Sequence, residues 1–129
     1  MIDFILRPFR RNFGKDKMFY RAIDVAAFLE IPWGVIHPNT LKESGLSDDE
    51  CAKINHEEND RYIEYALNRN LNIAYENMTF GKCAGYCTYV DQLIHLIDSY
   101  ADDRIGACLD TGHAHIFNDI TIGDAVSPI

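Results

Sequence analysis

Short apolar runs alternate along the chain with longer segments in which apolar side chains recur every three or four residues. The short runs are residues 2–6 (IDFIL), 33–38 (WGVIHP), 71–76 (LNIAYE) and 105–110 (IGACLD). Their length and polar borders are typical of buried β-strands. The longer segments, residues 17–30, residues 49–70 and the stretch after Thr88, are typical of amphipathic helices. Their spacing predicts two buried helix faces, one of Phe19, Ile23, Ala26 and Leu29, the other of Val90, Leu93, Ile94 and Ile97.

Polar residues mark the ends of these helices. Ser47 and Glu50 have the spacing of a capping box, in which each side chain bonds the backbone of the other. Asn70 is a candidate stop for the same helix, and Thr88 is a candidate cap for the next one.

Strands that alternate with helices predict an α/β fold with about four parallel strands, because neighbouring parallel strands are joined by crossovers of this kind. No linker or repeat divides the chain, so we expect one domain over residues 1–129. His37, Glu76 and Asp110 each follow an apolar run directly or end it. The carboxyl ends of parallel strands are where α/β folds build their sites, so these residues are candidates for one.

Composition narrows the classes of function. The chain has 129 residues, a net charge of −8 and four cysteines. The acidity opposes a nucleic-acid partner, although a basic cluster from Arg7 to Arg21 leaves room for a local anion site. No apolar run approaches the roughly 20 residues of a membrane span, and no secretory signal is evident, so we expect a cytoplasmic protein with reduced cysteines.

The candidate residues also have ordinary structural readings. Glu76 could cap a helix or pair with an arginine, and Asp110 with His113 could form a turn in which the histidine bonds back to the acid. His37 before Pro38 is more often structural when taken alone. His56 and His95 fall within helical patterns and are interpreted as surface or hydrogen-bonded residues.

Three motifs together resemble a known family. VIHP, IAYENM and ACLDTGHAH occur in the order and with roughly the spacing of the xylose isomerase-like TIM barrels, which include sugar-phosphate isomerases and epimerases and metal-dependent apurinic-site endonucleases. The resemblance covers essentially the whole chain but only about half of the family's barrel, from near the third strand to just past the sixth. It therefore implies a partial (β/α)8 TIM barrel that lacks the later strands, which carry a further histidine and glutamate in the family.

The resemblance also implies roles for individual residues. Glu76 matches a glutamate that ligates a divalent metal and acts as acid or base in many epimerases, and Asp110 matches a carboxylate ligand of the same metal. His113 matches a histidine that contacts substrate or a second metal. His37 matches a metal ligand of the endonucleases that is often merely near the site in sugar enzymes. His115 is given no role.

These residue types suit Mg²⁺, Mn²⁺, Co²⁺ or Zn²⁺. The leading hypothesis is a metal-dependent isomerase or epimerase of a sugar or sugar phosphate in carbohydrate metabolism, with proton transfer beside a carbonyl through an enediolate. The alternatives are an apurinic-site phosphodiesterase and a truncated, inactive portion of a barrel. Pairing of two copies could cover the open sheet of a partial barrel, so a homo-oligomer is a further expectation.

Overall fold

A computed structural model describes residues 3–4, 13–42, 44–79 and 84–115. In chain order, its elements are β1 (Asp3–Phe4), α1 (Phe13–Phe28), β2 (Trp33–Ile36), α2 (Asp48–Leu67), β3 (Asn72–Glu76), α3 (Val90–Asp98), β4 (Ile105–Cys108) and α4 (Thr111–His115). Strands therefore alternate with helices, as the hydrophobic pattern predicts.

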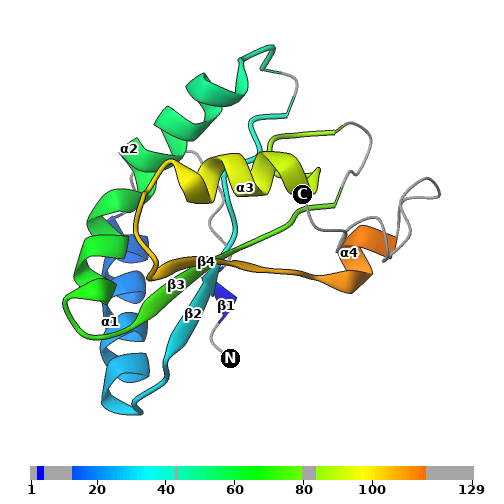
Figure 1. Cartoon of the computed structure of the whole chain (residues 1–129). Helices are drawn as coiled ribbons and strands as arrows, with labels where there is room; N and C mark the ends of the chain where they lie inside the picture. Colours follow the sequence, from blue (N-terminus) through cyan, green and yellow to red (C-terminus); the bar gives the residue numbers. More distant parts are fainter. Residues whose placement is uncertain (1–2, 5–12, 43, 80–83, 116–129) are drawn as a thin grey trace.

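The strands form one parallel sheet in which spatial order equals sequence order, β1-β2-β3-β4. Figure 1 shows α1, α2 and α3 along one side of this sheet and α4 beyond the far end of β4. A doubly wound sheet would reverse its strand order and carry helices on both faces. In a barrel the strands follow one another in sequence order, and all helices lie on the outer face. The described residues thus form part of a TIM barrel, which confirms the predicted fold class.

The core lies between the sheet and its helices. Ile36, Ile73, Tyr75 and Ile105 belong to one buried cluster, together with residues of α1, α2 and α3. Because side chains alternate along a strand, the neighbours of these residues face the other side of the sheet, which is the interior of a barrel. On that side Trp33 lies over Gly106, where an added Cβ would meet the indole at 3.1 Å.

The predicted start of α2 is confirmed, because Ser47 and Glu50 form the capping box. The helix ends at Leu67 with Asn68 as its C-cap, so the predicted stop at Asn70 is late; Asn70 has a left-handed backbone (φ 60°) three residues beyond the last helical residue. The prediction for Thr88 is wrong: Tyr89 is the N-cap of α3 and makes no side-chain cap bond, while the Thr88 hydroxyl accepts from the backbone N–H of Gly85. The nearby loop therefore takes the hydroxyl that the helix was expected to use.

The predicted helix faces are only partly correct. Ile23 and Ala26 are buried, but α1 ends at Phe28 and Leu29 is 59% exposed. In α3 the fully buried residues are Leu93 and Leu96, so the buried face is rotated from the predicted one.

Other sequence features fall partly outside the described residues. Most of the first apolar run, Arg7, Arg10, Arg11 and the segment 116–129 lie there, as does Cys83. Of the described cysteines, Cys51 and Cys87 are buried thiols outside any disulfide. His56 and His95 are hydrogen-bonded, as expected. In the part of the chain that can be described, no helix combines the length and apolarity needed to cross a bilayer.

Candidate metal centre

The ends of three neighbouring strands bring the candidate side chains together. His37 follows β2 and Glu76 is the last residue of β3. Asp110 lies two residues beyond β4, not within it as the apolar run suggested, and it precedes the short helix α4 that carries His113. The chain thus turns into α4 at the rim itself, which places a carboxylate and an imidazole one helical turn apart.

Glu76 is at the centre of the cluster. Its Oε2 lies 2.7 Å from His37 Nε2, and its Oε1 lies 3.7 Å from His113 Nδ1. His113 Nδ1 is also 3.5 Å from Asp110 Oδ2. Glu76, Asp110 and His113 each offer a ligand atom within 4.8 Å of the others, and they are the one such group of metal-ligating side chains that the described residues contain.

Burial and hydrogen bonding shift the pKa values of the two carboxyl groups, Glu76 and Asp110, in opposite directions. Burial raises the pKa of Glu76, a hydrogen bond shared with Asp110 raises it further, and the nearby imidazoles of His37 and His113 oppose the change. The pKa of Asp110 is lowered, chiefly because the backbone N–H of His113 donates to its carboxylate. Of the two carboxyl groups, Glu76 therefore takes up a proton more readily than Asp110.

Asn77 organises the cluster, and the sequence interpretation did not include it. Its Oδ1 accepts from the backbone N–H of Asp110 at 2.6 Å, and its Nδ2 donates to the carbonyl of Asp110 at 3.1 Å. Its own carbonyl lies 2.8 Å from His113 Nδ1. Since a carbonyl only accepts, Nδ1 carries a proton, and Nε2 is the nitrogen left to meet a ligand.

Local geometry also accounts for the glycine of the LDTGH motif. The Asp110 side chain caps α4, because its Oδ1 accepts from the backbone N–H of His113 at 2.9 Å. A Cβ on Gly112 would lie 3.0 Å from the same oxygen. The absence of a side chain at Gly112 therefore lets the carboxylate fold back over the helix start. Asn77 and Gly112 could have been found from their places beside Glu76 and His113 in the motifs.

The chain was compared with known proteins. The family model of the xylose isomerase-like TIM barrel matches residues 10–127. The chain belongs to this family. No curated protein sequence matches it.

Solved structures with the same fold include three informative relatives of this xylose isomerase-like chain. The IolI protein, crystallised with a bound zinc atom, has 18% identity and a TM-score of 0.68 over 88% of this chain and 41% of that one. A D-tagatose 3-epimerase-like protein has 20% identity and a TM-score of 0.61 over 89% and 51%. A Thermus thermophilus protein soaked with zinc chloride has 19% identity and a TM-score of 0.60 over 87% and 43%. The chain thus spans about half, or less, of their lengths.

Proposed function

We propose that Glu76, Asp110 and His113 hold a divalent metal ion, and that the protein acts on a sugar or sugar phosphate by isomerisation or epimerisation. The observation that carries the proposal is the convergence of two carboxylates and an imidazole at the strand ends of a family barrel. Oxygen and nitrogen ligands suit Mn²⁺, Mg²⁺, Co²⁺ and Zn²⁺. The residues that surround the ligands also fit a metal site, since Asn77 holds both Asp110 and His113 in place by hydrogen bonds.

The roles of the residues follow from their surroundings. A bound divalent ion would supply positive charge that stabilises an enediolate as it develops on the sugar. Glu76 is the residue we assign to move the proton beside the carbonyl, because its raised pKa brings its two protonation states closer in energy near neutral pH. His37 orients the Glu76 carboxylate, and Nε2 of His113 would be its ligand atom for the ion, because Nδ1 is bonded to the carbonyl of Asn77.

Two of the structural relatives support a metal ion, because the IolI protein was crystallised with zinc and the Thermus thermophilus protein was soaked with it. The third, a D-tagatose 3-epimerase-like protein, supports a sugar substrate. We extend this chemistry to the present chain as a single domain over residues 1–129, in which the rim of the sheet is the site.

Metal titration of the chain tests the proposal. We expect Mn²⁺ and Zn²⁺ to bind with a stoichiometry of one in isothermal titration calorimetry, and Asp110→Asn to weaken binding by more than about 100-fold, beyond the usual effect of an outer-shell partner. The matched control is Asp60→Asn, because Asp60 also pairs with a histidine, at 3.0 Å from His56, but lies on the exposed side of α2. Equal affinities for all three proteins would refute the site.

Catalysis requires its own test. In any form of the protein that turns over a sugar, Glu76→Gln is expected to abolish exchange of the substrate carbon-bound proton with D₂O, because the amide keeps the shape and loses the base. Metal binding should survive in part. Full exchange by this variant would remove Glu76 from the mechanism.

One observation favours the apurinic-site phosphodiesterase as a second candidate. His37, which matches a metal ligand of those enzymes, lies against Glu76. The net charge of −8 opposes a DNA partner, because nonspecific binding depends on neutralising phosphates. Cleavage of an abasic-site oligonucleotide by the metal-loaded protein would reverse the ranking.

A further inference from the structure

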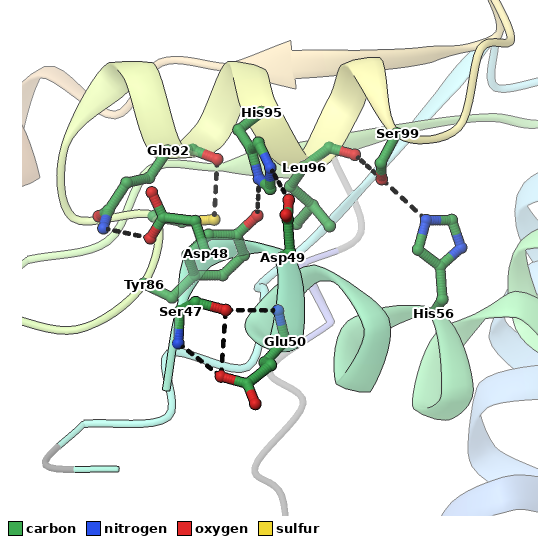
Figure 2. Close-up of polar contacts among 11 residues, drawn as sticks. Ser47, Asp48, Asp49, Glu50, His56, Tyr86, Gln92, His95, Leu96 and Ser99 are labelled. Atoms are coloured by element: carbon green, nitrogen blue, oxygen red, sulfur yellow. Dashed lines mark hydrogen bonds and ion pairs between the residues drawn. The ribbon is translucent and has the colours of Figure 1, made fainter. Parts of the chain in front are cut away.

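The loops that follow β2 and β3 are joined to each other by a backbone hydrogen bond. The backbone N–H of Tyr86, in the second loop, donates to the carbonyl of Thr40, in the first, at 2.6 Å. The Tyr86 ring is buried, and its hydroxyl bonds His95 Nδ1 on α3 at 2.8 Å. His95 Nε2 in turn lies 2.8 Å from Asp49 in the first turn of α2, and Figure 2 shows this sequence of contacts between the helices.

Gly85 makes the approach of the two loops possible. A Cβ at this position would lie 2.8 Å from the carbonyl oxygen of Thr40 and 2.8 Å from its Cβ. It would also lie 2.7 Å from Cγ of Lys42, but that flexible side chain can move. The carbonyl cannot move freely, because it is the acceptor of the Tyr86 bond. Any side chain at position 85 therefore pushes the loops apart.

The backbone beside this contact is strained on both sides. Leu41 has φ 46° and Cys87 has φ 65°, a region that residues with a Cβ seldom occupy. Strained residues persist where the surrounding structure determines them strongly, and they cluster at functional sites.

Hydrogen bonds fix both loops close in sequence to residues of the proposed metal site. In the second loop, the carbonyl of Cys87 accepts from the backbone N–H of Met78 at 2.9 Å, next to Asn77. In the first loop, Asn39 is clamped to α2, because its N–H donates to Asn55 Oδ1 at 2.7 Å and its carbonyl accepts from Asn55 Nδ2 at 3.0 Å. Asn39 is two residues from His37.

We propose that Gly85 is a positioning residue, whose close contact with Thr40 sets the register between the loop bearing His37 and the end of β3 with its loop, which bear Glu76 and Asn77. The inference rests on the proposed function, which gives that register its importance. Widening the contact by one methyl group should displace His37 relative to Glu76 and Asn77 without touching any of them.

Gly85→Ala tests this in the metal-free protein and again during metal titration. The first readout is the imidazole nitrogen and proton resonances of His37 and His113 in long-range ¹H–¹⁵N spectra, recorded with a chelator present. We expect both sets to shift in Gly85→Ala, and Zn²⁺ affinity to fall by about 10- to 100-fold, the usual range for a residue outside the ligand shell.

Two controls separate positioning from folding. Gly34→Ala places its methyl group 3.6 Å from Ile73 and Leu71, ordinary contacts on the helix side of β2, and should change neither readout. Leu96→Ala removes a fully buried core side chain of α3, so it should lower the melting temperature while leaving the His37 resonances in place. If Gly85→Ala does not fold, Tyr86→Phe replaces it, because this variant loses only the hydroxyl contact with His95. It should shift the same imidazole resonances of His37 and His113, by a smaller amount.

The outcomes distinguish the two proposals. Wild-type imidazole resonances in folded Gly85→Ala, or in Tyr86→Phe where Gly85→Ala does not fold, would overturn the positioning role whether or not metal binds. Shifted resonances in a protein whose wild-type form binds no metal would support the positioning role and refute the metal site.

Discussion

Glu76 combines two properties that seldom occur together, burial and ionisable chemistry. Its side chain is 10% exposed, and it touches His37 and is close to His113. Its pKa is raised because desolvation, together with the hydrogen bond to Asp110, outweighs the two imidazoles. A metal ion would reverse this balance, because it replaces the proton as the partner of the carboxylate.

The raised pKa predicts how stability depends on pH when a chelator removes metal. A folded-state pKa above the usual 4.5 means that folding favours protonated Glu76, so its contribution is fully present below pH 4.5 and is lost as pH rises through the folded pKa. Glu76→Gln should therefore melt at a higher temperature than wild type at neutral pH, with the difference vanishing at low pH. Thermal melts by circular dichroism across about pH 3.5–8 measure it.

The control for this experiment is Glu64→Gln, since Glu64 is exposed on α2. It should follow the wild-type curve. A Glu76→Gln variant that is less stable than wild type at neutral pH would show that the bond with His37 outweighs burial.

Asn77 gives a second prediction about a single residue. Asn77→Ala leaves the N–H and carbonyl of Asp110 without their side-chain partners, so the carboxylate loses its fixed place. We expect Zn²⁺ affinity to fall by about 10- to 100-fold. Calorimetric titration measures this, with Asn68→Ala at the exposed end of α2 as the control. Unchanged affinity in Asn77→Ala would mean that α4 alone positions Asp110.

Among the elements, α2 is bonded both to the loop after β2 and to α3. It carries Asn55, which holds the loop after β2, and its first turn receives His95 from α3. Figure 2 shows the capping box of Ser47 and Glu50 beside the contact of Asp49 with His95. The first turn of α2 therefore carries both the cap that stabilises the helix and the contact that links it to α3.

Loss of the helix cap should lower the free energy of unfolding while leaving the geometry of the metal site largely unchanged. Ser47 Oγ accepts from the backbone N–H of Glu50 at 3.2 Å, and Ser47→Ala removes this bond. The expected loss is about 1 kcal/mol of unfolding free energy, the usual effect for an N-cap serine. Urea unfolding measures it. Ser44→Ala, which removes one exposed loop bond to Leu46, is the control and should change stability less.

At the scale of the whole molecule, the described sheet has two strands with one paired side each. β1 pairs with β2 and β4 pairs with β3, and these are the outer ladders found among residues 3–4 and 33–108. Such edges present unpaired backbone groups that can pair with another chain. The barrel side of the sheet also carries Trp33, which is 39% exposed.

We expect the purified chain to self-associate through these edges. Sedimentation velocity should therefore give a mass above the 14.8 kDa of one chain. Ala107→Lys places a charge at an exposed position of the edge strand β4 and should shift the distribution toward the monomer. The Lys53→Ala variant, on the outer face of α2, is the control. A wild-type monomer over a wide concentration range would contradict the expectation.

The hydrophobic pattern determined the order of strands and helices, because periods of two and of about 3.6 residues are properties of the local chain. It also determined that His37 and Glu76 end neighbouring strands, and parallel pairing then brings both to one rim. The capping box at Ser47 was equally predictable, since its two partners are three residues apart and need no third element.

Contacts between distant segments decided the rest. Thr88 matched a cap in sequence, but its hydroxyl bonds Gly85 in the loop. Asn77 became the organiser of the rim only because β4 and α4 place Asp110 and His113 against it, 33 and 36 residues along the chain. Gly85 is needed because Thr40 approaches from another loop. Local propensity cannot specify such positions, because their geometry exists only once the sheet has brought the loops together.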